Sequence, residues 1–270
     1  MEAGMNTISF ISANYVARQL NYHMTRGWNQ GETATNNYFM PLETFPQRFE
    51  DLLKEIKSLG FSAMDVWLAH LNPRWATPEH ITAAQALLTC SGMRVVSLAG
   101  GLGSTPEELE AICVLARSLD APILGGVCPL LEKDRHCVVS LLKKYGLKLA
   151  CENHLEKDPQ EMLERIGDGA DGTIGSAVDT GWYATQGYDA ARAIRLLGEH
   201  VFHVHLKDVR VVGSHDSCRF GEGVVPLREC VQALRQSGYP GAISIEIESE
   251  LFNPDRDVVA SRQMLEGWLQ

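Results

Sequence analysis

The sequence predicts a (β/α)8 barrel, in which eight parallel strands alternate with eight helices. Three observations support this fold class. Short β-branched runs alternate with amphipathic stretches eight times, the repeats fill the roughly 250 residues typical of such a barrel, and no low-complexity tract or linker interrupts them. We therefore expect a single domain over residues 1–270, with its chemistry at the carboxyl ends of the strands.

The predicted elements follow in order along the chain. Runs rich in β-branched residues predict strands at 7–12, 63–68, 94–98, 122–126, 147–151, 173–178, 201–206 and 242–247. Apolar residues that recur every three or four positions predict helices at 45–59, 78–90, 106–119, 130–145, 159–166, 189–200, 226–237 and 254–268. Two spans, 14–44 and 208–225, have no such pattern and are expected to be irregular, the first as an aromatic-rich insert after strand 1.

Helix boundaries are also visible in the sequence. Four helices are expected to begin where a capping side chain precedes a proline, at Thr77, Thr105, Asp158 and Asn253. Glycines that follow helical runs are expected to end them, at Gly60, Gly92, Gly146 and Gly238. The rival fold, a doubly wound open sheet, usually carries a G-x-G-x-x-G turn. Only residues 100–103 come near it, and we interpret this Gly-Gly-Leu-Gly run as a flexible loop.

Composition limits the partners. The chain has 45% hydrophobic residues and a net charge of -10, so it can form a core and is a poor match for nucleic acid or an anionic membrane. No apolar run approaches the roughly 20 residues of a membrane-spanning helix, and the start of the chain lacks the basic region of a secretion signal. Its seven cysteines contain no C-x-x-C pair. We therefore expect reduced thiols and a cytoplasmic protein.

Four potential ligands stand at the ends of strands five to eight: Glu152, Asp179, His205 and Glu246. Neighbouring strands lie about 4.8 Å apart, so these side chains can meet at one point. Three carboxylates so close would repel and raise each other's pKa, unless a divalent cation lies between them. Oxygen ligands with one imidazole favour Mn²⁺, with Mg²⁺, Co²⁺, Fe²⁺ or Zn²⁺ as alternatives. The alternative is that each is an ordinary polar residue at a strand end.

The segments ACENH, VDTGW, HVHLKD, FGEG and ISIEIE resemble the sugar phosphate isomerase/epimerase family, a group of xylose isomerase-like barrels. The resemblance implies that Glu152, Asp179, His205 and Glu246 bind the metal and that the two glutamates are an acid/base pair. Two positions depart from the family. A histidine common three residues after the strand-six aspartate is Trp182 here, and an arginine common six residues after the strand-seven histidine is Val211, with Arg210 one position earlier. These departures put a standard epimerase of free ketoses in doubt.

The region 13–53 and the segment DVWLAHLNP resemble the catalytic α subunits of bacterial C-glycoside deglycosidases. That resemblance implies a lyase acting on 3-oxo-glycosides by β-elimination, with His154 as the base and a small β subunit as a partner of an oligomer. This is our leading hypothesis. The alternatives are a keto-sugar epimerase or isomerase and a non-catalytic sugar-binding or partner subunit.

Further residues are candidates for substrate contact. They are His70, Trp182, Lys207, Arg210 and Trp28. For each, an ordinary packing or capping role is the alternative. We expect His203 to support the site from the core, and Glu248 to lie at the rim rather than among the ligands. The substrate is expected to be a keto-sugar or an oxidised glycoside. Basic residues are scattered, so nothing predicts a phosphate site.

Overall fold

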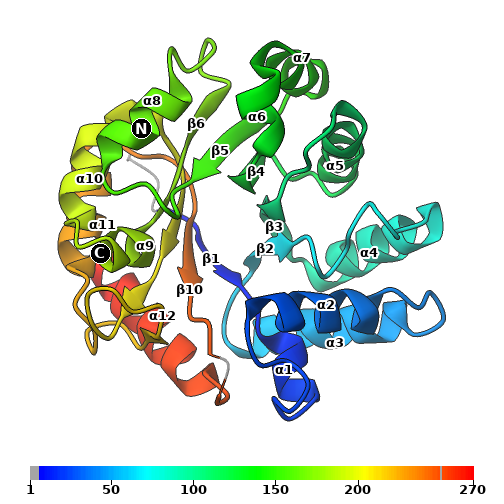
Figure 1. The fold of residues 1–270 in the computed structure, drawn as a ribbon. Helices are drawn as coiled ribbons and strands as arrows, with labels where there is room; N and C mark the ends of the chain where they lie inside the picture. The colour runs from blue at the N-terminus through cyan, green and yellow to red at the C-terminus, as the bar shows by residue number, and fades with distance from the viewer. Residues whose placement is uncertain (1–5, 250) are drawn as a thin grey trace. The chain divides into compact units, whose positions relative to one another are not determined.

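The computed structural model describes residues 6–249 and 251–270. The first five residues, part of the start interpreted above as lacking a secretion signal, lie outside this range. Eight parallel strands close a barrel in the order β1-β10-β7-β6-β5-β4-β3-β2, which confirms the predicted fold class (Figure 1). They are β1 Ile8–Ile11, β2 Ala63–Trp67, β3 Arg94–Gly101, β4 Ile123–Val127, β5 Lys148–Glu152, β6 Ile174–Asp179, β7 Val201–Leu206 and β10 Ile243–Glu246.

The glycine run that we interpreted as a loop belongs partly to a strand. Gly100 and Gly101 end β3 and pair with Gly126 and Val127 of β4. A Cβ atom on Gly126 would lie 2.0 Å from the Gly100 carbonyl oxygen, so the two backbones approach too closely for any side chain there. The interpretation as a loop was wrong for Gly100 and Gly101, which extend β3, whereas Leu102 and Gly103 lie outside the strand.

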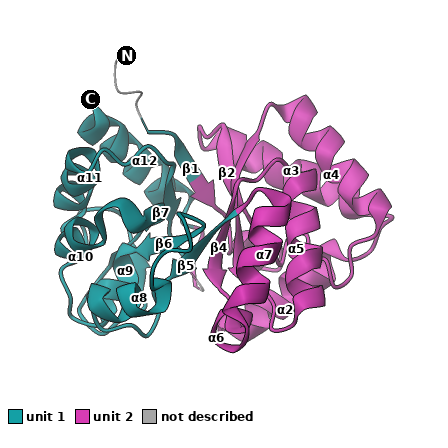
Figure 2. Ribbon diagram, turned by 90° about the horizontal axis from the view of Figure 1, so that it is seen from above, with its two compact units in different colours: residues 1–9, 148–248, 254–270 teal, residues 10–147, 249–253 magenta. Residues whose placement is uncertain are grey.

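The chain divides into two compact units, which Figure 2 colours separately. The first contains residues 6–9, 148–248 and 254–270, and it includes β5, β6, β7 and β10. In it, α8, α10, α11 and α12 lie on the outer side of the strands (Figure 1). The helices of this unit are α8 Pro159–Ile166, α9 Thr180–Thr185, α10 Ala190–Leu197 with the 3-10 turn η1 Gly198–His200, α11 Leu227–Gln236 and α12 Asp255–Leu269.

The span 208–225 contains a small antiparallel ribbon rather than being wholly irregular. Strands β8 Asp208–Val209 and β9 Ser217–Cys218 pair there. Such two-residue strands are too short for period-2 alternation to be read from the sequence.

The second unit contains residues 10–147, 249 and 251–253. Its helices are α1 Tyr15–Gln19, α2 Trp28–Phe39, α3 Phe45–Ser58, α4 Pro78–Ser91, α5 Pro106–Ser118, α6 Pro129–Lys133 and α7 Arg135–Tyr145. The insert 14–44 was expected to be irregular, but α1 and α2 occupy much of it. The pattern was missed because α2 buries only Thr35 and Phe39. Phe39 lies against Phe45 and Phe49 of α3, so tertiary packing supports this helix.

Most predicted helix boundaries are confirmed. The Asp158 carboxylate accepts hydrogen bonds from the Gln160 and Glu161 amides at the start of α8, and all four expected terminal glycines have positive φ. Two boundaries differ. The expected helix 130–145 is broken at Asp134, which caps α7 through the Cys137 amide. Helix α12 begins at Asp255 with Pro254, not Asn253, in the capping position.

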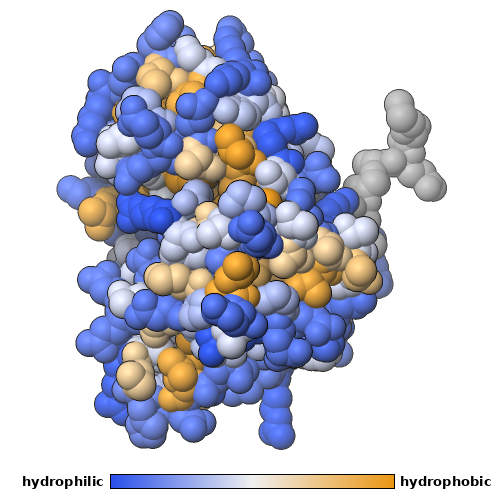
Figure 3. Space-filling view, turned by 90° about the vertical axis from the view of Figure 1, so that its right-hand side faces the viewer, coloured by the Kyte–Doolittle hydropathy of each residue, from blue (hydrophilic) through white to orange (hydrophobic). Residues whose placement is uncertain are grey.

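On the face drawn in Figure 3, hydrophilic residues dominate and hydrophobic ones occur in small separate groups. Within the described residues, no helix combines the length and apolarity needed to cross a bilayer.

Candidate metal centre

The four predicted ligands meet within the first unit. Glu152, Asp179 and Glu246 are the last residues of β5, β6 and β10, and His205 is the penultimate residue of β7. Asp179 pairs with His205, whereas Glu152 pairs with Ala177, two positions before Asp179. Even offsets keep all these side chains on one face of the sheet. One candidate ligand atom from each of the four lies within 4.8 Å of those of the others.

The histidine stands between the two glutamates. Its Nδ1 atom lies 2.6 Å from Glu152 Oε1 and 3.1 Å from Glu246 Oε2. The side chain of His205 is 2% exposed, and Asp179 is fully buried. Three carboxylates and one imidazole therefore converge in a site that is almost closed to water.

The electrostatics of the cluster favour a cation. Burial raises the pKa of Asp179 to about 6, against the pull of Lys207 and with the help of Glu246 and Glu152. The prediction that all three carboxylates have a raised pKa is wrong for the two glutamates. Burial acts to raise their pKa values as well, but His205 lowers that of Glu152, and Lys207 with His205 lowers that of Glu246.

Two buried oxygens of the cluster have a charged neighbour but no hydrogen bond of normal geometry from any described residue. Asp179 Oδ2 lies 3.7 Å from Lys207 Nζ, and Glu246 Oε2 lies 3.1 Å from His205 Nδ1. A divalent cation would satisfy both oxygens more fully than these contacts do. The donor set therefore fits a divalent cation, which Glu152, Asp179, His205 and Glu246 could hold.

His154 lies next to Glu152, two residues further along the chain. Its Nε2 atom is 3.5 Å from Glu152 Oε2, and its side chain is 31% exposed. Its ring packs edge-on against Trp182, which in turn contacts His215 of the β8–β9 loop. Trp182 thus takes the position of the expected family histidine and covers His154 rather than offering a ligand.

Lys207 enters the carboxylate cluster itself. Its Nζ atom lies 3.1 Å from Glu246 Oε1, 3.7 Å from Asp179 Oδ2 and 2.5 Å from Glu248 Oε2. Although burial lowers the pKa of Lys207, Glu246, Glu248 and Asp179 raise it well above its usual value. Glu248, expected at the rim, is 25% exposed and joins the cluster through this lysine.

Two further residues of this unit support the site or its surroundings. His203 is buried, contacts the His205 ring edge-on and lies 3.3 Å from the Ser244 hydroxyl, as expected of a supporting residue. The Asp208 carboxylate accepts hydrogen bonds from the amides of Gly221, Gly223 and Val225. Asp208 therefore holds the FGEG loop, a role that the sequence did not reveal.

The remaining candidate contacts have other partners. Arg210 is half exposed and pairs with Asp216 at the base of the β8–β9 loop, rather than with the carboxylate cluster. In the second unit, Trp28 packs on Trp67, and His70 is buried edge-on against Phe39 and Trp67. Burial lowers the pKa of His70 to about 3. Substrate contact by these residues stays a prediction.

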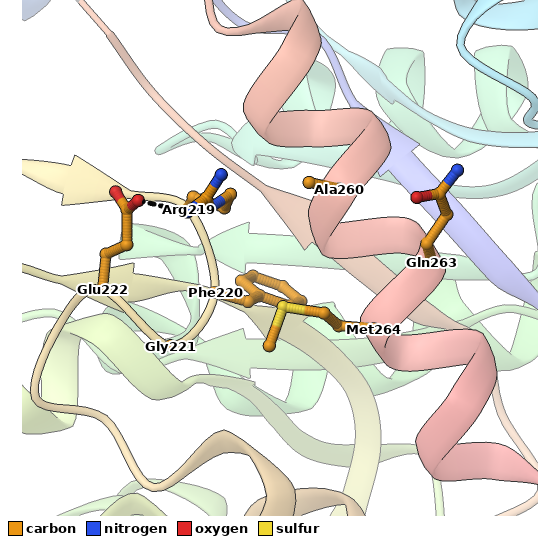
Figure 4. Close-up of a pocket in the computed structure, with 7 residues that line it drawn as sticks. All are labelled: Arg219, Phe220, Gly221, Glu222, Ala260, Gln263 and Met264. Atoms are coloured by element: carbon orange, nitrogen blue, oxygen red, sulfur yellow. Dashed lines mark ion pairs between the residues drawn. The ribbon is translucent and has the colours of Figure 1, made fainter.

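A surface pocket of the first unit is separate from this cluster. Figure 4 shows the Arg219–Glu222 ion pair on one side and Gln263 and Met264 of α12 on the other, with Phe220 beneath. None of the residues that line it is one of the four candidate ligands.

A family model described as xylose isomerase-like TIM barrel matches residues 132–268, half of the chain, including all four candidate ligands. The chain belongs to this family. Solved xylose isomerase-like barrels have the same fold. A D-tagatose 3-epimerase-like protein has a TM-score of 0.66 at 21% identity, over 80% of this chain and 91% of that one. L-ribulose 3-epimerase has a TM-score of 0.67 at 17% identity, over 83% and 89% of the two chains.

Sequence relatives of this xylose isomerase-like chain match over shorter stretches. An uncharacterized protein of Methanocaldococcus jannaschii is 30% identical over 142 residues, which are 49% of this chain and 46% of that protein. L-ribulose-5-phosphate 3-epimerase of Salmonella paratyphi B is 40% identical over 69 residues, which are 25% of this chain and 24% of the epimerase. The matches thus span less than half the length of either relative.

Proposed function

We propose that this chain is a divalent-metal-dependent enzyme that epimerises a keto-sugar at the carbon next to its carbonyl. One observation carries the proposal: Glu152 and Glu246 approach the same His205 nitrogen, at 2.6 and 3.1 Å, from strands on either side of β6 and β7. Two carboxylates that face one centre suit removal of a proton by one and its return by the other.

The residues have separate tasks in this reaction. A bound divalent cation would act as a Lewis acid for the carbonyl and its neighbouring hydroxyl. One glutamate accepts the proton from the carbon next to the carbonyl, and the other donates a proton to the opposite face. Burial of the cluster excludes water, which strengthens the electrostatic interactions within it. The epimerase names among the similar proteins support this direction over the lyase hypothesis.

A second candidate rests on His154. Its Nε2 atom is 3.5 Å from Glu152 and its side chain is partly exposed, so it can serve as a further base at the edge of the cluster. Proton removal by His154 followed by loss of a leaving group would make the chain a lyase for 3-oxo-glycosides. The first half of that reaction is shared with the epimerase.

Hydrogen exchange separates these functions. The Mn²⁺-loaded protein is incubated in D₂O with free ketoses, ketose 5-phosphates and 3-oxo-glucosides, and products are followed by NMR. We expect deuterium at the carbon next to the carbonyl, together with the epimer of a ketose. Release of the aglycone from a 3-oxo-glucoside without ketose exchange would favour the lyase. No exchange on any substrate, with Mn²⁺ bound, would support a sugar-binding subunit instead.

A further inference from the structure

The ammonium group of Lys207 is enclosed by the acidic side chains of the candidate metal centre. It lies between Glu246 and Asp179, both candidate ligands, and Glu248, which is not one. Its side chain is only 6% exposed. A buried lysine needs such partners because an uncompensated charge in the interior is costly.

Two neighbouring residues, Thr180 and Gly181, fix the position of Lys207. The Thr180 hydroxyl donates a hydrogen bond to the Lys207 carbonyl and accepts one from its amide, at 2.8 and 2.9 Å. The lysine stem then passes over Gly181, where a Cβ atom would lie 2.8 Å from Lys207 Cγ. The Thr180–Gly181 pair at the start of α9 therefore holds the backbone and leaves room for the stem.

Lys207 and His205 contact different oxygens of the Glu246 carboxylate. It contacts Oε1, whereas Oε2 lies 3.1 Å from the Nδ1 atom of His205. It also changes the charge of the cluster. Three carboxylates converge here, with Glu248 paired to the lysine beside them. The ammonium offsets one of their charges while competing for the oxygens that a cation would use. At such short distances and in a buried site, this effect is large.

We propose that Lys207 is a positioning residue of the metal centre, which holds Glu246 by Oε1, keeps Oε2 turned toward His205 and weakens the binding of the divalent cation. Glu248 opposes this weakening of cation binding, because its carboxylate draws the Lys207 ammonium away from Glu246 and Asp179. The part of this inference that concerns catalysis rests on the proposed function, whereas the part that concerns cation affinity does not.

Calorimetric titration with Mn²⁺ tests the inference through two variants with opposite effects. Lys207→Met removes the competing charge, so Mn²⁺ should bind at least tenfold more tightly. Glu248→Gln removes a carboxylate and releases the ammonium toward Glu246, so Mn²⁺ should bind at least threefold more weakly. Lys207→Arg keeps the charge and is the matched control, with an affinity within about threefold of the wild type.

A purely structural role would weaken Mn²⁺ binding in Lys207→Met, which would overturn the inference, as would unchanged affinity. If that variant does not fold, Glu248→Gln decides: equal or tighter binding of Mn²⁺ would contradict the proposal. At saturating Mn²⁺, Lys207→Met should also lose at least tenfold in kcat for hydrogen exchange with little change in KM. A wild-type protein that binds Mn²⁺ but exchanges no hydrogen would remove the proposed function and leave the affinity prediction intact.

Discussion

The Nε2 atom of His154 lies 3.5 Å from the Oε2 atom of Glu152, whose other oxygen is 2.6 Å from His205. Glu152 therefore has a histidine at each carboxylate oxygen. Only one of these, His205, belongs to the candidate ligand set. His154 is consequently the residue whose removal best separates the two catalytic hypotheses.

His154→Ala should keep Mn²⁺ binding and retain ketose hydrogen exchange within about tenfold of the wild type, because the two glutamates of the proposed acid/base pair remain. Loss of a true general acid or base typically costs about a hundredfold or more. NMR in D₂O and Mn²⁺ titration measure both quantities. His215→Ala, which alters the same stack of rings beyond Trp182, is the control. Abolished exchange with Mn²⁺ still bound would instead identify His154 as the base and favour elimination.

The buried His70 should make the protein sensitive to acid. Its pKa is near 6.5 when unfolded and about 3 when folded, because burial disfavours the charged ring. Between these values the unfolded state binds a proton that the folded state does not, so stability falls as pH falls from about 6.5 toward 3. The contribution reaches at most about 1.4 kcal/mol per pH unit.

His70→Phe keeps an aromatic ring against Phe39 and Trp67 and removes the titrating group. The slope of unfolding free energy against pH, from urea titrations between pH 6 and 4, should become shallower by about 1 kcal/mol per pH unit. The absolute stability can change in either direction, since the ring is larger. An identical slope in both proteins would show that His70 is not neutral in the folded state.

Asp208 should stabilise the fold through the loop that follows β9. Its fully buried carboxylate accepts three backbone hydrogen bonds, from Gly221, Gly223 and Val225. Asp208→Ala leaves those amides without their acceptor and should lower the free energy of unfolding by about 2–3 kcal/mol. Asp208→Asn keeps one acceptor oxygen and should lose less. Urea denaturation measures both variants, and a loss below about 0.5 kcal/mol for alanine would contradict this role.

The sequence was sufficient for the parts of the structure that depend on local patterns. The eight barrel strands and the convergence of the candidate ligands Glu152, Asp179, His205 and Glu246 follow from alternation and from polar residues at strand ends. It was insufficient where a residue acts through a distant partner. Lys207 comes only two positions after the candidate ligand His205. Only the fold, however, shows that its ammonium lies between Glu246 and Glu248.

The same limit explains the missed elements. Helix α2 is held by the packing of Phe39 on α3 rather than by an apolar stripe of its own. The assignment of Gly100 and Gly101 to β3 depends on the glycine that faces them in β4, more than twenty residues away in sequence. Both features are consequences of tertiary contacts, for which a single sequence carries little signal.

Mn²⁺ binding tests the central claim most directly. Metal analysis and calorimetric titration of the wild type should give one tightly bound divalent ion per chain. The double variant Asp179→Asn, Glu246→Gln removes two of the three candidate ligand carboxylates and should bind none, while Glu222→Gln, at the separate surface pocket, should bind as the wild type does. A wild-type protein that binds no divalent ion, or a double variant that binds it as well as the wild type, would contradict the account.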